Sequence, residues 1–92
     1  MTKEELKQRV CEAIRKRRAD IEGIAQNIFS EPELGFKEQK TSKKVQQAFK
    51  AMGLTCETGW GITGVKTRVK GRKSLKTVAL LGELDAIVCR EH

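Results

Sequence analysis

The sequence contains few of the residues that build disulfide frameworks or membrane spans. Its three cysteines, Cys11, Cys56 and Cys89, are an odd number without a Cys-x-x-Cys pair, which indicates free thiols in a reducing compartment. The first residues are charged and lack the apolar stretch of a secretory signal, and no apolar run is long enough to cross a bilayer. We therefore expect a cytoplasmic protein with no membrane partner.

Aromatic residues are also scarce, and this bears on the basic charge of the chain. Nineteen Lys and Arg against twelve Asp and Glu give a net charge of +7, which raises nucleic acid or another anionic surface as a partner. However, acidic residues are interleaved with the basic ones, and no aromatic residues alternate with them, so we expect no nucleic-acid partner. The densest basic run, residues 15–18, spreads around a helix and mostly faces water. A small basic binding module for an anionic partner remains the alternative function.

The length and composition describe one small globular segment. Ninety-two residues bury a smaller fraction of their unfolded surface than a typical enzyme domain, so a deep two-sided cleft is not expected from this chain alone. A hydrophobic content of 38%, a charged content of 34% and a single proline are typical of a packed chain rather than a disordered or fibrous one.

Hydrophobic spacing predicts two helices in the first half of the chain. Thr2 and Glu5 form a capping-box pattern, and apolar residues then recur at helical spacing to about Phe29, which predicts a first helix over residues 3–29. Pro32 and Gly35 interrupt this pattern and predict a connector. A second amphipathic helix is predicted over residues 37–52, ended by Gly53 and with these residues on its inner side: Val45, Ala48, Phe49 and Met52.

The second half of the chain predicts about three strands. Residues 54–58 and 65–69 alternate in polarity and predict two half-buried strands, joined by a glycine-rich loop or bulge. The basic outer face of the second strand is expected to protect a sheet edge. Residues 77–81 are apolar on both faces, as in a central strand covered on two sides. Because the other elements can hardly cover both sides, we predict an α/β fold that is an incomplete piece of a larger domain.

Two carboxylates follow the predicted central strand. Glu83 and Asp85 stand at its carboxyl end, where open α/β sheets form their ligand crevice. In an extended chain they share one side, which suits metal ligation or a carboxylate that orients a ligand. Glu-x-Asp is a common tripeptide, so an ordinary acidic exit from a strand is an equal alternative on spacing alone.

Cys89 and His92 add two further types of zinc ligand near the carboxyl end. A structural zinc site normally needs a second ligand pair, and the remaining sequence offers none. We therefore expect this chain alone to hold no zinc tightly. A terminal loop with a free thiol is the simpler interpretation of this pair.

Several short segments stand in a characteristic order along the chain. They are Pro32-Glu33-Leu34-Gly35-Phe36-Lys37-Glu38, Thr41, Gly53-Leu54, Thr58-Gly59-Trp60-Gly61-Ile62-Thr63-Gly64-Val65 and Val78-Ala79-Leu80-Leu81-Gly82-Glu83-Leu84-Asp85-Ala86. In this order they resemble the zinc-dependent amidohydrolases and metallopeptidases of the aminoacylase and carboxypeptidase family. The resemblance spans about residues 20 to 92, and the chain looks most like the branch that includes aminobenzoyl-glutamate hydrolase and the auxin-conjugate hydrolases.

This resemblance implies a catalytic α/β domain that binds two divalent metals, zinc or manganese. Such enzymes hydrolyse the amide bond of an N-acyl amino acid or a dipeptide with metal-activated water and a Glu general base. It further implies that residues 1–92 are a single N-terminal segment of the catalytic domain. The rest of that domain and an inserted lid or dimerisation domain would then be absent, and a small amide or peptide substrate and a possible homo-oligomer belong to the same expectation.

The resemblance also assigns roles to the two carboxylates. Asp85 matches the Asp of the family's His-x-Asp motif and is therefore expected to be catalytic. Glu83 occupies the position of the metal-binding His, a departure also seen as an acidic residue in the aminoacylase-like branch, which implies a place on the metal side. The later ligands of that branch, which include a Cys-x-His motif and a Glu pair, are not in this chain. We therefore expect the chain to be inactive alone.

Overall fold

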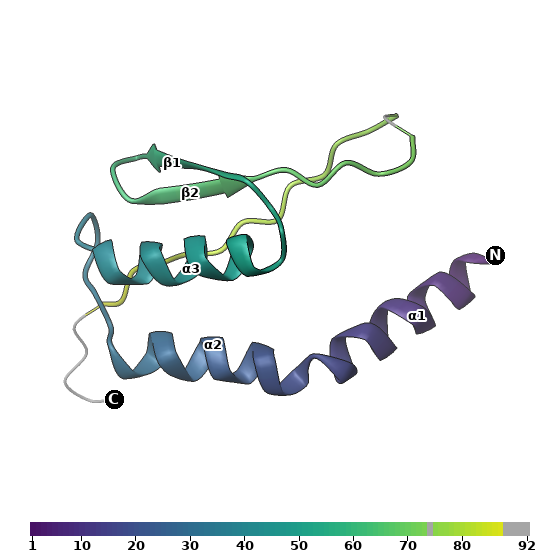
Figure 1. Cartoon of the computed structure of the whole chain (residues 1–92), viewed down its shortest axis with the longest axis horizontal. Helices are drawn as coiled ribbons and strands as arrows, with labels where there is room; N and C mark the ends of the chain where they lie inside the picture. Colours follow the sequence, from purple (N-terminus) through teal and green to yellow (C-terminus); the bar gives the residue numbers. More distant parts are fainter. Residues whose placement is uncertain (74, 88–92) are drawn as a thin grey trace. The chain divides into compact units, whose positions relative to one another are not determined.

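The computed structural model describes residues 1–73 and 75–87 and confirms the α/β class (Figure 1). The chain divides into two compact units, Met1–Ser30 and Glu31–His92. Within the described part, none of the helices combines the length and apolar character that a membrane span requires. The elements are helices α1 (Lys3–Lys16), α2 (Arg18–Ser30) and α3 (Gln39–Ala51), and strands β1 (Cys56–Trp60) and β2 (Gly64–Thr67).

The first unit consists of α1 and α2. The predicted capping box is confirmed, because the Thr2 hydroxyl accepts from the Glu5 amide at 3.2 Å and the Glu5 carboxylate accepts from the Thr2 amide at 3.4 Å. The prediction of one continuous helix was wrong at Arg17, where φ is −99° and ψ is 12°. The Arg17 amide is shared between the carbonyls of Ala13 and Ile14, so the last turn of α1 tightens before α2 begins.

Helix α3 is the first regular element of the second unit. It ends before Gly53, as the sequence predicts. Gly53 has a φ of +77°, its amide donates to the Lys50 carbonyl, and the Leu54 amide donates to the Phe49 carbonyl. These two bonds form a Schellman motif, which satisfies carbonyls that the helix end would otherwise leave unpaired. The helix packs against both strands of the hairpin (Figure 1).

The two strands pair in an antiparallel hairpin with a bulge at Gly59. Cys56 pairs with Thr67, and the register shifts between Thr58 and Trp60. Gly59 has a φ of +82°, a conformation that glycine adopts at little cost and that suits the bulge expected from the sequence. Trp60 then pairs with Gly64 across the turn, so the hairpin connection is short.

The predicted third strand, residues 77–81, is not formed among the described residues. A strand needs a hydrogen-bonded neighbour, and the described sheet has only two members. The side chains of the apolar run remain almost fully exposed, at 86% for Val78, 98% for Leu80 and 97% for Leu81. The prediction of a strand covered on both faces was therefore wrong for this structure, because no described element supplies either a ladder partner or a cover.

Burial in the described chain is confined to polar side chains. Glu38, Thr41 and Ser42, near the start of α3, are buried, whereas no hydrophobic residue among the described residues is. Of the apolar residues expected on the inner side of α3, Phe49 is half-buried and Met52 is exposed. The second unit is thus organised around hydrogen bonds at one end of α3.

Candidate functional site

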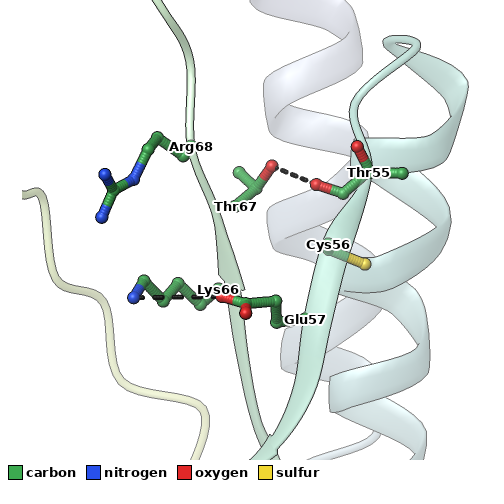
Figure 2. A pocket seen from close by; sticks show the side chains of 6 residues that line it. All are labelled: Thr55, Cys56, Glu57, Lys66, Thr67 and Arg68. Carbon is green, nitrogen blue, oxygen red and sulfur yellow. Dashed lines mark hydrogen bonds and ion pairs between the residues drawn. The ribbon is translucent and has the colours of Figure 1, made fainter.

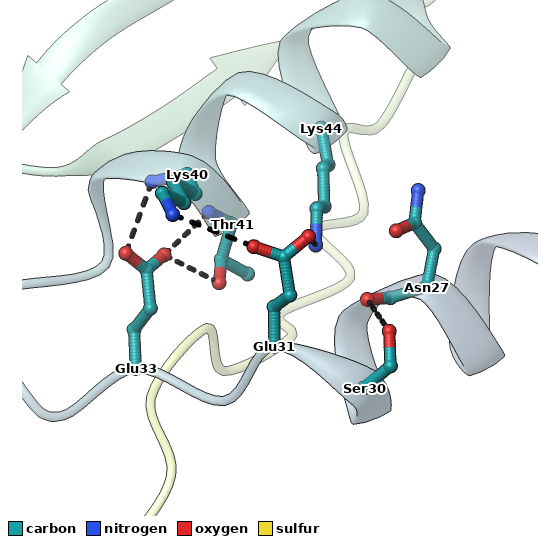
Figure 3. Close-up of polar contacts among 7 residues, drawn as sticks. All are labelled: Asn27, Ser30, Glu31, Glu33, Lys40, Thr41 and Lys44. Atoms are coloured by element: carbon teal, nitrogen blue, oxygen red, sulfur yellow. Dashed lines mark hydrogen bonds and ion pairs between the residues drawn. The ribbon is translucent and has the colours of Figure 1, made fainter.

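Glu33 caps α3 from outside the helix (Figure 3). Its Oε1 accepts from the Thr41 amide at 2.6 Å and from the Thr41 hydroxyl at 2.8 Å, and its Oε2 accepts from the Lys40 amide at 3.2 Å. The residue at the N-cap position, Glu38, makes no side-chain capping bond of its own. A carboxylate at a helix N-terminus satisfies free amides and complements the helix dipole.

Glu38 connects the turn before α3 to the hairpin. Its Oε1 accepts from the Phe36 amide at 2.9 Å, and its Oε2 accepts from the Thr63 hydroxyl at 2.5 Å. Phe36 has a φ of +62°, which is uncommon for a residue with a side chain, so the bond to its amide helps to hold an unfavourable backbone conformation. Segments about twenty-five positions apart in the sequence are joined by one buried carboxylate.

Glu31 adds ion pairs on the outside of α3. Its two carboxylate oxygens lie 3.5 Å from Lys40 Nζ and 3.4 Å from Lys44 Nζ (Figure 3). Such partly exposed pairs contribute little individually to the free energy of folding. Together they nevertheless link the connector, through Glu31, to the first two turns of α3.

The two carboxyls in this network have lowered pKa values. For Glu33, the hydrogen bond from the Thr41 amide is the largest cause, and desolvation opposes it. For Glu38, the hydrogen bond from the Thr63 hydroxyl is the largest cause of the lowered pKa. Desolvation and the nearby charge of Glu33 both act in the opposite direction and raise the pKa. Both side chains are therefore held in the ionised form that their donors require.

Acid is expected to unfold the second unit through these two groups. A carboxyl whose pKa is lower in the folded state than in the unfolded one contributes stability above the unfolded pKa, about 4.3 for Glu, and that contribution is lost as the pH falls through the folded pKa. The melting temperature of the chain should therefore decline steadily below about pH 4. In the double variant Glu33→Gln/Glu38→Gln it should be lower at pH 7 and depend less on pH in this acidic range. Equal acid sensitivity in the two proteins would contradict this assignment.

Glu83 and Asp85, the site residues predicted from the sequence, lie in the segment that pairs with the turn containing Glu33 and Leu34. Ala86 forms a parallel bridge with Leu34, and its amide donates to the Glu33 carbonyl at 2.7 Å. Asp85 directly precedes this bridge and Glu83 stands two residues earlier. Both side chains are exposed, and no hydrogen bond or ion pair to either is found among the described residues. Asp85 thus directly precedes an anchored residue, and both carboxylates are exposed to solvent.

The described residues do not form a complete metal centre. No group of three or more His, Cys, Asp or Glu side chains that could hold a metal ion occurs within residues 1–73 and 75–87. Cys89 and His92, the other candidate ligands, lie outside the described residues. Glu83 and Asp85 offer oxygen atoms that suit a divalent cation, but they need further ligands from elsewhere.

The basic face of the hairpin forms a shallow hollow (Figure 2). Lys66 and Arg68 extend to the same side of the strand, as residues two apart must. Lys66 has two contacts within the hairpin: its Nζ lies 3.9 Å from the Glu57 carboxylate, an ion pair, and 4.8 Å from the centre of the Trp60 ring, a cation–π contact. Thr67 donates to the Thr55 carbonyl at 2.6 Å and closes the end of the ladder. These contacts suit a protected sheet edge.

Sequence reasoning missed the polar network. The residues of that network were part of the family resemblance, but they received no individual role. One weak signal was available, because negatively charged side chains such as Glu33 are stabilising near the N-terminus of a helix. The long-range bond between Glu38 and Thr63 had no sequence signal.

Comparison with known proteins finds several hydrolases that share sequence with the chain. Thermostable carboxypeptidase 2 of Saccharolobus solfataricus is 39% identical over 69 residues, which are 74% of this chain and 18% of that protein. The N-acyl-L-amino acid amidohydrolase of Geobacillus stearothermophilus is 30% identical over 92 residues, which are 100% of this chain and 24% of that protein. Hippurate hydrolase of Campylobacter jejuni is 36% identical over 72 residues, which are 78% of this chain and 19% of that protein.

The extent of these matches is limited. The chain spans about a fifth of the length of the curated relatives it matches. No protein-family model matches it, and no solved structure does. The relationship therefore rests on sequence alone.

Proposed function

We propose, from the premise that the chain is homologous to this family of amidohydrolases and carboxypeptidases, that it forms the N-terminal segment of a metal-dependent amidohydrolase. The observation that carries the proposal is the match of all 92 residues to an N-acyl-L-amino acid amidohydrolase. The substrate would be an N-acyl amino acid or a dipeptide, cleaved in the cytoplasm. Residues 1–92 would be one part of the catalytic domain, with its remainder and an inserted lid or dimerisation domain outside this chain.

Glu83 and Asp85 would face the metals in the intact enzyme. Their exposed carboxylates shortly precede Ala86, whose amide donates to the Glu33 carbonyl and anchors the chain at that point. Glu83 has the donor chemistry to approach zinc or manganese directly, and Asp85 would orient a group on the metal side. A bound divalent metal would supply an activated water for attack on the amide carbonyl. The remaining ligands would come from outside the described residues, because those residues contain no complete set.

A chimera tests this function directly. The aligned region of the Geobacillus stearothermophilus amidohydrolase is replaced by residues 1–92, and hydrolysis of N-acyl amino acids is measured with zinc or manganese present. The proposal expects the chimera to retain activity above that of a control in which the same region is deleted. A folded, metal-loaded chimera with no activity would overturn it.

The isolated chain is expected to show no hydrolysis of N-acyl amino acids above background. A metal-activated water needs several protein ligands, and the described residues do not provide them. The assay uses purified 92-residue protein with hippurate or N-acetyl amino acids, with zinc, manganese or a chelator. Turnover that depends on added metal would show that this chain alone forms a working centre.

The isolated chain is also expected to self-associate. The run that contains Val78, Leu80 and Leu81 is almost fully exposed, and contiguous exposed apolar surface commonly seeks a partner. Light scattering coupled to size-exclusion chromatography should show oligomers, and the double variant Leu80→Lys/Leu81→Lys should shift them towards the monomer. A monodisperse monomer at all concentrations would contradict this expectation.

A further inference from the structure

Glu33 is bonded to two different parts of the second unit. Its carboxylate accepts three hydrogen bonds from Lys40 and Thr41 at the start of α3. Its main-chain carbonyl accepts from the Ala86 amide at 2.7 Å. Ala86 directly follows Asp85 in the chain. A single residue therefore joins the N-terminus of α3 to the segment that carries the two exposed carboxylates.

We propose that Glu33 is a positioning residue that holds Asp85 and Glu83 in place relative to α3. The proposal rests on the proposed function, in which these two carboxylates face the metals. It gives the turn that precedes α3 a role in that function. The turn would hold the segment that carries Glu83 and Asp85, the acidic segment, in a fixed position.

The contacts make Glu33 a rigid support. Its carboxylate accepts two hydrogen bonds from Thr41, which is only 1% exposed. If these bonds were broken, water could not readily replace them. With the side chain anchored in this way, the Glu33 carbonyl has little freedom to move. Leu34 continues the contact as a parallel bridge to Ala86, which fixes the direction of the acidic segment as well as its distance.

Glu38 serves as a natural comparison. It is buried and accepts two hydrogen bonds, from Phe36 and Thr63, whereas Glu33 is half-buried and accepts three from Lys40 and Thr41. No hydrogen bond to the described part of residues 83–87 is found for it. Loss of the Glu38 carboxylate should therefore loosen the hairpin turn and leave the acidic segment in place, which separates a positioning role from general destabilisation.

Amide hydrogen exchange in the isotope-labelled full chain tests the proposal, with Leu80→Lys/Leu81→Lys present in every sample to keep the protein towards the monomer. In Glu33→Gln, the Ala86 amide should exchange about tenfold faster and its chemical shift should move, the effect of losing one hydrogen bond of ordinary net strength. In Glu38→Gln, the Ala86 amide should be unchanged while Gly64 and Val65 exchange faster. Thr41→Val removes one of the three donors and should give an intermediate result, and Thr41→Ser, which keeps the hydroxyl, should restore the native exchange rate.

The outcome distinguishes this proposal from the function on which it rests. Equal Ala86 exchange in Glu33→Gln and the native chain would overturn the positioning role, whatever the activity of the chimera. In the chimera, Glu33→Gln should lower kcat more than it raises KM, because misplaced carboxylates harm the reaction more than substrate binding. If the native chimera is inactive but Ala86 responds as expected, the function fails and the structural link stands.

Discussion

The Asp85→Asn substitution, made in the chimera with the Geobacillus stearothermophilus amidohydrolase, is expected to lower turnover ~10- to 100-fold. The side chain is exposed and has no partner among the described residues, so the melting temperature should hardly change. Asparagine is nearly isosteric with aspartate, but it lacks the negative charge that would orient a group on the metal side. The effect should therefore appear in the chemistry and not in the fold.

Glu83→Gln is the matched comparison for this substitution. It also replaces an exposed carboxylate by an amide, two residues earlier in the same segment. If the metals are held mainly by later residues, as in the aminoacylase-like branch, its effect should be the smaller of the two. Kinetics at saturating zinc or manganese, with melting temperature as the control for folding, rank the two roles. Near-normal turnover in Asp85→Asn would remove this residue from the catalytic site.

Local features of the fold could be predicted because short-range chemistry determines them. The capping box at Thr2 and the helix stop at Gly53 each depend on residues within a few positions, and both were confirmed. The two strands and the glycine bulge between them were also confirmed, since alternation in polarity and glycine turns are short-range signals, although β1 is mostly exposed and not half-buried as predicted. Its strands begin or end within about two residues of the predicted limits, a normal spread for such boundaries.

Features that depend on distant partners could not be predicted in this way. Residues 77–81 have the composition of a central strand, but composition does not supply the neighbouring strand or the cover that such a strand needs. The bond from Thr63 to Glu38 likewise joins residues that no local rule connects. The break at Arg17 is different, because it is a one-residue change of backbone geometry within a strongly helical pattern.

The family resemblance and the polar network involve the same residues. The segments that carry the resemblance contain Glu33, Glu38, Thr41 and Thr63. In the structure, Thr41 donates hydrogen bonds to Glu33, and Thr63 donates one to Glu38. A network of this kind stabilises only when its members are all satisfied, and no buried side-chain polar atom lacks a partner among the described residues. The segments that carry the resemblance therefore also have a structural role in this chain.

Gly64→Ala is expected to destabilise the hairpin strongly. A methyl group at this position would lie 2.2 Å from the Trp60 carbonyl oxygen and 3.2 Å from the Trp60 Cβ. The obstruction is backbone, which cannot rotate away as a side chain can, so the Trp60 and Gly64 pairing must open. Overpacking of this kind typically costs about 1–3 kcal/mol, and occasionally more.

Two measurements and one control isolate this effect. Trp60 is the only tryptophan, so its fluorescence reports the hairpin directly, and urea unfolding followed by circular dichroism reports the whole chain. Gly71→Ala is the control, because a Cβ there meets nothing within 4 Å. Gly64→Ala should shift both the fluorescence and the unfolding midpoint, whereas Gly71→Ala should shift neither. Because Thr63 precedes Gly64 and donates to Glu38, the opened turn should also weaken that buried bond. Identical behaviour of the two variants would show that the close approach to Trp60 does not constrain the hairpin.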